Sequence, residues 1–206
     1  MSRSIVTLSW LLVLCGGLAV TGAHAASVVV EVVDARGVPL SDAVVFLESP
    51  SASKLVQPVV GAEIVQEARQ FQPATLVVPR GTFVQFPNRD TVRHHVYSFS
   101  PTKRFELKLY TGTHANPVHF DRAGVVILGC NIHDQMVGWI VVVDTSHYGK
   151  TSATGKFRLD GVPAGGYRLR VWHHRLPVGG PASDQPLEVS GDRVASARVV
   201  LQELQP

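Results

Sequence analysis

Short apolar runs rich in valine recur along the chain, and turn-forming Gly, Pro, Asp and Asn residues separate them. Runs of this length and composition are typical of β-strands, and helical periodicity is nearly absent after the N-terminal segment. Residues 27–48 read as strand, turn and strand, with the turn at residues 34–37. Residues 71–88 read as two more strands joined by a hairpin turn at residues 79–81. A linker or surface loop of small residues is expected at 49–61. The pattern predicts an all-β protein.

Two of the apolar runs flank the most distinctive stretch of the sequence. Residues 124–128 and 137–143 each read as a buried strand, so the polar loop between them is expected at one end of a β-sandwich. This loop contains Cys130, His133 and Met136, spaced as Cys-x2-His-x2-Met. A thiolate, two imidazoles and a weak axial thioether form a blue-copper site. The loop therefore predicts copper, provided that a second histidine comes from elsewhere.

Two other interpretations of these three residues were considered. A lone buried Cys or Met is usually a core side chain, but the two together with a histidine in one short loop are much rarer. Zinc is the competing metal, and it prefers closed sets of Cys and His with little use for Met.

The second histidine is expected from the pair His94 and His95, which follows the polar loop at residues 88–93. Adjacent residues of a strand face opposite sides of the sheet, so only one of the two can point into the site. Alternation alone leaves the choice open, because His95, Tyr97 and Phe99 also form a plausible inner face.

Residues 1–25 have the features of a secretory signal peptide. Arg3 is positively charged, residues 9–20 are apolar, and residues 23–25 (Ala-His-Ala) fit the small-x-small cleavage rule. The apolar run is too short to favour an uncleaved membrane anchor. We therefore expect a periplasmic or secreted protein with no membrane span in the mature chain. Cleavage would remove Cys15 and leave Cys130 as a lone thiol, which metal ligation would protect in an oxidising compartment.

Charge and motifs exclude several classes of function. The chain has 19 basic and 16 acidic residues, a formal net charge of +3, which is too weak to indicate nucleic-acid binding. The sequence shows no Ser-His-Asp order, no Gly-rich phosphate loop and no convergent carboxylate pair. We therefore expect a protein without catalytic residues rather than an enzyme.

The motifs Phe86-x-Asn88, His94-x-Val96 and Cys130-x2-His133-x2-Met136 resemble those of the cupredoxins, the small blue copper proteins. The spacing of the last motif is that of the amicyanin branch. Residues 93–100 and 129–134 are also similar to secreted methylamine-utilisation and plastocyanin-like proteins. The resemblance covers about residues 61–144.

The resemblance implies a cupredoxin-like Greek-key β-sandwich over residues 61–144. It implies one copper ion that alternates between Cu(I) and Cu(II), and it selects His94 over His95. The implied function is one-electron transfer with a redox partner protein of the cell envelope, such as a dehydrogenase or a c-type cytochrome. The implied copper ligands are His94, Cys130, His133 and Met136.

A second resemblance concerns the two ends of the chain. The pattern Gly37-x-Pro39-Leu40-x-x-Ala43-x-Val45 resembles the start of a carboxypeptidase-regulatory-like, or transthyretin-like, β-sandwich, and residues 154–173 resemble its closing strands. We predict that residues 26–60 and 145–206 form this smaller, discontinuous sandwich, with the copper domain inserted into it. The alternative is that residues 27–48 belong to the copper domain and residues 145–206 form a separate module.

Two other functions are compatible with the same residues. One is an envelope copper carrier or buffer that uses the same ligands for storage. The other is a β-sandwich module that binds a protein or a carbohydrate and in which copper is structural. Redox cycling with a partner protein distinguishes an electron carrier from both.

Overall fold

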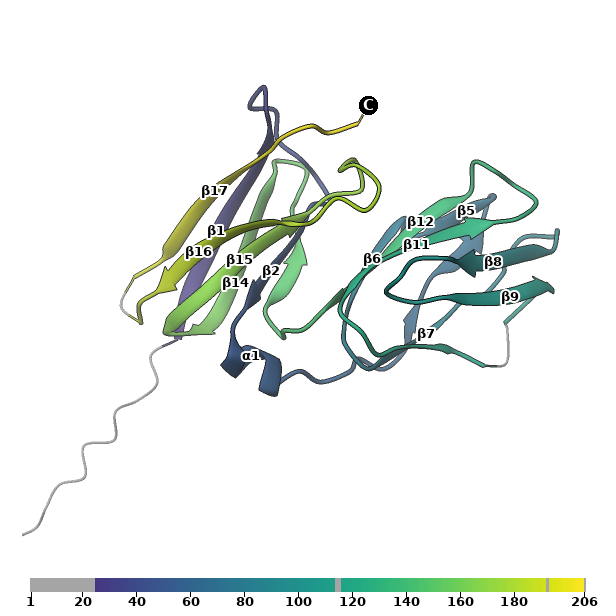
Figure 1. The fold of residues 1–206 in the computed structure, drawn as a ribbon, viewed down its shortest axis with the longest axis horizontal. Helices are drawn as coiled ribbons and strands as arrows, with labels where there is room; N and C mark the ends of the chain where they lie inside the picture. Colours follow the sequence, from purple (N-terminus) through teal and green to yellow (C-terminus); the bar gives the residue numbers. More distant parts are fainter. Residues whose placement is uncertain (1–24, 114–115, 192, 206) are drawn as a thin grey trace, which may run out of the picture.

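The computed structural model describes residues 25–113, 116–191 and 193–205, and these fold almost entirely into β-strands (Figure 1). The single helix of the described residues is α1 (Pro50–Lys54). None of the described residues belongs to a helix long and apolar enough to cross a membrane. The predicted signal peptide, residues 1–25, falls on residues 1–24 and lies outside the described residues apart from its last position.

One sandwich, called here the terminal sandwich, is built from strands near both ends of the chain. A three-stranded sheet in the order β14-β1-β17 packs on a four-stranded sheet in the order β13-β2-β15-β16. β1 pairs antiparallel with β14 and parallel with β17, while β2 pairs antiparallel with β15. The strands are β1 (Ala25–Asp34), β2 (Val44–Glu48), β13 (Tyr148–Lys150), β14 (Lys156–Pro163), β15 (Gly165–Trp172), β16 (Ser183–Val189) and β17 (Ala195–Leu201).

The core of the terminal sandwich follows from strand alternation. In β1, Val28, Val30 and Val32 are fully buried because every second side chain of a strand points to the same face. A Cβ added to Gly149 would clash with the ring of Phe157, so glycine is needed there for the phenyl ring to pack over the backbone. Valine alternation in β1 therefore determines which face of the sheet is internal.

Leu169 provides a test of this core, because it is fully buried at the centre of β15, opposite Leu47 of β2. We expect Leu169→Ala to lower the free energy of unfolding by about 2–5 kcal/mol, through lost apolar contacts and the cavity left behind. Denaturant unfolding followed by circular dichroism measures the change. Val60→Ala is the control, since Val60 is 100% exposed and its truncation should have almost no effect. Equal losses in the two variants would contradict the assignment of the core.

The other sandwich, called the central sandwich, contains the stretch predicted to bind metal. A five-stranded sheet in the order β6-β12-β11-β8-β9 packs on a three-stranded sheet in the order β10-β7-β3, and a small β4-β5 hairpin lies beside them. The strands are β3 (Ala62–Glu63), β4 (Val65–Glu67), β5 (Gln70–Gln72), β6 (Thr75–Pro79), β7 (Thr82–Gln85), β8 (His94–Ser98), β9 (Phe105–Tyr110), β10 (Val118–Phe120), β11 (Gly124–Cys130) and β12 (Val137–Val143).

The prediction of a hairpin turn at residues 79–81 is wrong. β6 pairs with β12, whereas β7 pairs with β10 and β3 in the other sheet. The Arg80 amide donates to the Val143 carbonyl, and the Gly81 amide donates to the Phe120 carbonyl, so successive residues bond to different sheets. The turn therefore carries the chain from one layer of the central sandwich to the other.

The loop expected at residues 49–61 also differs from the prediction, because it contains α1. The Ser49 hydroxyl accepts a hydrogen bond from the Ala52 amide and so caps the first turn. Pro50 suits this turn because the first amides of a helix have no acceptor within it, so proline's lack of an N–H breaks no hydrogen bond. The small residues of this segment thus form a short helix between the two sandwiches, as seen in Figure 1.

The two sandwiches pack against each other through outward-facing apolar residues. Val44 and Phe46 of β2 form a buried cluster with Val141 and Val143 of β12 and with Trp172. Because β1 and β2 share sheets with β14 and β15, segments on either side of the central sandwich complete one structure. The domain boundaries at residues 60/61 and 144/145 stay a prediction.

Candidate metal centre

His94 is the first residue of β8, and the loop before it is held in place by Asn88. The Asn88 side-chain amide donates to the carbonyls of Val92 and Tyr110, and its oxygen accepts from the Asp90 amide. Two of these bonds lie within the loop, and the third, to Tyr110, connects the loop to β9. The His94 side chain is fully buried, so its position is determined by the core rather than by solvent.

The stretch predicted to bind metal forms a compact loop between β11 and β12. The His133 amide donates to the Cys130 carbonyl at 3.3 Å, and the Met136 amide donates to the His133 carbonyl at 2.9 Å. Each potential ligand is therefore one tight turn from the next. Cys130 and Met136 are buried in the core of the central sandwich, while His133 is partly exposed. The x2 spacing in the sequence corresponds to these successive turns.

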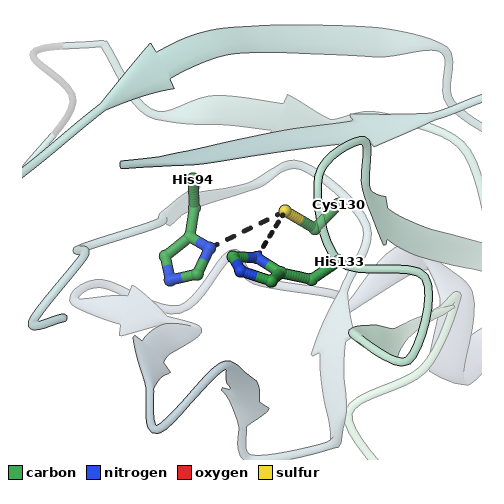
Figure 2. Close-up of side chains that lie close together, drawn as sticks. All are labelled: His94, Cys130 and His133. Carbon is green, nitrogen blue, oxygen red and sulfur yellow. Dashed lines mark hydrogen bonds between the residues drawn. The ribbon is translucent and has the colours of Figure 1, made fainter. Parts of the chain in front are cut away.

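The side chains of His94, Cys130 and His133 converge although they come from two segments of the chain. Figure 2 shows both imidazole rings beside the Cys130 sulfur, and Nδ1 of each ring lies 3.7 Å from it. The potential ligand atoms all lie within 4.8 Å of one another. Metal–nitrogen and metal–sulfur bonds of about 2.0 and 2.3 Å that meet at 120° would separate N and S by about 3.7 Å. The two nitrogen–sulfur separations thus fit a trigonal metal site.

His95 points away from this group. Its Nε2 lies 2.9 Å from a Glu106 carboxylate oxygen on the outer face of the five-stranded sheet. Only 13% of its side chain is exposed. The structure brings His94, and not His95, to Cys130.

Asp90 is a neighbour of the site that the sequence analysis did not identify. Its Oδ2 lies 2.7 Å from Nε2 of His94, and the backbone amides of Ala68 and Arg69 donate to its carboxylate at 2.8 and 2.9 Å. Burial opposes ionisation of Asp90, but the hydrogen bonds from Arg69, His94 and Ala68 outweigh it and hold its pKa below the ordinary value. The carboxylate is therefore an anion that connects the β4-β5 turn to His94.

The turn that binds Asp90 is strained. Ala68 and Arg69 have φ angles of 52° and 57°, in the left-handed region that L-residues other than glycine rarely adopt. Charge-assisted hydrogen bonds to Asp90 offset this strain. The turn thereby presents two amide donors side by side to one carboxylate.

The contact with Asp90 determines which nitrogen of His94 is available. A carboxylate that accepts the Nε2 proton leaves the Nδ1 lone pair free, and Nδ1 is the atom that faces Cys130. The same contact limits rotation of the ring. Asp90 is thus a positioning residue for the proposed ligand.

We expect Asp90→Asn to weaken copper binding by about 10- to 100-fold, because the amide neither holds the His94 tautomer nor supplies a negative charge behind the ring. Copper affinity measured by competition with a chelator tests this expectation. Asp134→Asn is the matched control. It makes the same change in the loop between β11 and β12, at a residue outside the His94–Asp90 contact. Unchanged affinity in Asp90→Asn would contradict the positioning role.

A buried polar pair lies behind His94. The Gln66 side-chain amide donates to the Tyr110 hydroxyl and to the Phe86 carbonyl, and Tyr110 pairs with His94 across β8 and β9. Burial, with a smaller contribution from the charge of Cys130, raises the pKa of Tyr110 to about 12 against the opposing Gln66 hydrogen bond. Tyr110 is therefore a neutral phenol at physiological pH.

The remaining histidines of the described residues do not form a second group of this kind. Among the described residues, His94, Cys130 and His133 are the one set of three closely spaced metal-ligating groups drawn from His, Cys, Asp and Glu. His173 is buried, and its Nε2 lies 3.1 Å from the Ser41 carbonyl. His173 is therefore a structural residue of the terminal sandwich.

Comparisons with known proteins give structural matches only. No protein-family profile matches the chain, and no curated protein matches it. A purple cupredoxin from Nitrosopumilus maritimus shares 26% identity over 40% of this chain and 99% of its own, with a TM-score of 0.36. A reduced amicyanin variant shares 26% over 50% of this chain and 99% of its own, with a TM-score of 0.36. The copper-containing nitrite reductase of Thermus scotoductus SA-01 shares 22% over 54% of this chain and 28% of its own, with a TM-score of 0.38.

Proposed function

We propose that the protein is an exported type 1 copper protein that carries one electron at a time. The observation that supports it is the convergence of Nδ1 of His94, Sγ of Cys130 and Nδ1 of His133 at one end of the central sandwich. One thiolate and two imidazoles, with a thioether nearby, are the donors that suit copper in both oxidation states. Bound copper would supply a centre that accepts and releases one electron.

The chain supplies a rigid frame for this chemistry. His94 and Cys130 extend from paired strands of one sheet, and Met136 packs in the same core cluster as Cys130. A ligand set fixed by strands and buried packing changes little in geometry when the charge of the site changes. This rigidity favours rapid electron exchange over ligand substitution, so we propose a carrier rather than an enzyme.

His133 is the proposed route by which the electron leaves the site. Its side chain is partly exposed. Ile132, the residue before it, and Val137, the first residue of β12, expose 49% and 41% of their surface. An apolar rim of this kind permits close contact with a redox partner in the cell envelope, such as a dehydrogenase or a c-type cytochrome. Arg89 and Arg93, in the loop before His94, favour an acidic partner.

We expect Met136→Gln to keep copper but to lower its reduction potential, because an oxygen donor stabilises Cu(II) relative to Cu(I). Spectroelectrochemical titration of the two proteins measures the difference. Val137→Gln is the control, because it adds the same polar group at the next, exposed position. Equal potentials in wild type and Met136→Gln would remove Met136 from the proposed ligand set.

Electrochemistry of the copper-loaded protein tests the proposed carrier function. We expect a reversible one-electron couple that survives repeated cycling without loss of metal. Release of copper on reduction would instead indicate a copper carrier or buffer. Absence of any couple in a copper-loaded protein would contradict electron transfer as its function.

A further inference from the structure

The five-stranded sheet of the central sandwich has an outer face that is covered along only part of its width. The terminal sandwich packs on the β6, β12 and β11 side of it, where Val77, Val125, Trp139, Val141 and Val143 belong to the inter-sandwich cluster. β8 and β9 are the last two strands at the opposite side of the sheet, and Figure 1 draws them away from the terminal sandwich. Their outer surface is therefore open to a partner.

The open part of this surface is aromatic at its centre. The rings of Tyr97 and Phe99 lie 5.1 Å apart on successive outward positions, and Phe99 is 75% exposed. His95 continues the row, with its ring 6.0 Å from that of Tyr97. An exposed aromatic side chain held by a second ring is well placed for protein contact, because aromatic residues are enriched at interfaces.

The same surface is positively charged. Residues 93–110 contain four basic residues and one acidic residue, and the ion pair of Lys103 with Asp121 offsets one of the basic charges. Arg104, which immediately precedes β9, and Lys108 of β9 are both exposed, whereas the side chain of Leu107 on β9 points into the core. Among the described residues, no carboxylate lies within ion-pair distance of either one, whereas Glu106 is paired with His95.

The surface also lies close to the metal centre. Tyr97 pairs with Gly129 across β8 and β11, and Val96 pairs with Cys130. A Cβ added to Gly129 would lie only 2.7 Å from Cζ of Tyr97, so the phenol ring rests directly on the backbone that precedes Cys130. A protein that contacts Tyr97 is thus one residue away from the proposed thiolate ligand.

We propose that His95, Tyr97, Phe99, Arg104 and Lys108, together the β8-β9 face, form a docking surface for an acidic one-electron redox protein. This face is distinct from the rim around His133. Its assignment as a docking surface rests on the proposed function. The reduced partner loses one electron, Cu(II) becomes Cu(I), and no proton moves. With one partner on the β8-β9 face and another at His133, donor and acceptor can bind at the same time.

Nuclear magnetic resonance of the mature chain, with cytochrome b5 as an acidic haem-protein probe, tests the docking surface independently of electron transfer. We expect amide shifts concentrated in residues 95–108, and the affinity should fall steeply as salt is raised. The double charge reversal Arg104→Glu, Lys108→Glu should weaken binding by about tenfold or more. Phe99→Ser should weaken it as well, and because Phe99 is exposed its loss leaves the core unchanged.

The matched control is Lys156→Glu, Arg158→Glu, which makes the same charge change on exposed positions of the terminal sandwich. Equal weakening by both double variants would show that net charge alone causes the loss of binding, and it would overturn the proposal. Shifts centred on His133, or a concentration-dependent dimer that Phe99→Ser removes, would overturn it too. If the protein binds copper normally but fails these tests, only the proposed docking surface is rejected. If it forms no copper–thiolate site, the proposed function is rejected.

Discussion

Cys130→Ser is expected to abolish the intense visible absorption of the copper-loaded protein completely. That absorption requires charge transfer from a thiolate to Cu(II), and a serine hydroxyl is neither soft enough nor readily deprotonated. Cys130 is the one free cysteine of the described residues and is buried at the end of β11, so no other thiol is at hand to replace it. Absorption spectra during titration with Cu(II) measure the effect.

The first control for Cys130→Ser is a measurement of whether the variant still folds. Serine is close to cysteine in size, so circular dichroism and the unfolding midpoint should change little. The adjacent variant Asn131→Ser should keep the full absorption, since it introduces a serine at the next, exposed position of the loop. A folded Cys130→Ser protein that still turns blue with copper would contradict the thiolate as ligand.

His94→Ala is expected to destroy the copper–thiolate absorption, whereas His95→Ala is expected to leave it nearly intact. Nδ1 of His94 lies 3.7 Å from the Cys130 sulfur, while the His95 ring lies on the opposite face, beside Glu106. Loss of the His94 imidazole leaves the site with a single nitrogen donor of the proposed set. Spectra and copper affinities of both variants, compared with wild type, measure the difference.

His95→Ala is the matched control for His94→Ala, because it removes the same group from the next residue. The reverse outcome, with His95→Ala destructive and His94→Ala silent, would show that the ligand assignment is wrong by one residue. Equal loss in both variants would indicate that general disturbance of β8, rather than ligation, causes the effect.

The sequence was most informative where the chemistry is local. Cys130, His133 and Met136 lie within seven residues, and two turns bring them together, so spacing alone predicted the loop. His94 is 36 residues from Cys130, and only the register of β8 against β11 places it there. The assignment of these four residues as copper ligands stays a prediction.

Asp90 could not be recognised from the sequence, although it contacts His94 four residues later. Its role depends on the β4-β5 turn, whose amides at Ala68 and Arg69 reach it from more than twenty residues away. The turn itself was hidden, because neither residue is among those that usually adopt positive φ. Contacts between distant segments leave no periodic signal in a sequence.

The strands were predictable from short valine-rich runs between turn residues, but their assignment to sheets was only partly so. The valines of β1 indicated a strand, and the structure confirms an all-β fold. The turn at residues 79–81 looked like a hairpin because Gly81 follows a strand, yet its amides bond to two different sheets. A turn residue shows where a strand ends and does not show which strand it will pair with.

The absorption and electron paramagnetic resonance spectra of the protein loaded with one equivalent of Cu(II) test the central claim most directly. The convergence of His94, Cys130 and His133 predicts an intense thiolate-to-copper band in the visible region and the narrow copper hyperfine splitting that accompanies a covalent Cu–S bond. A weak visible band with wide hyperfine splitting, typical of copper bound only by nitrogen and oxygen, would contradict the type 1 copper site.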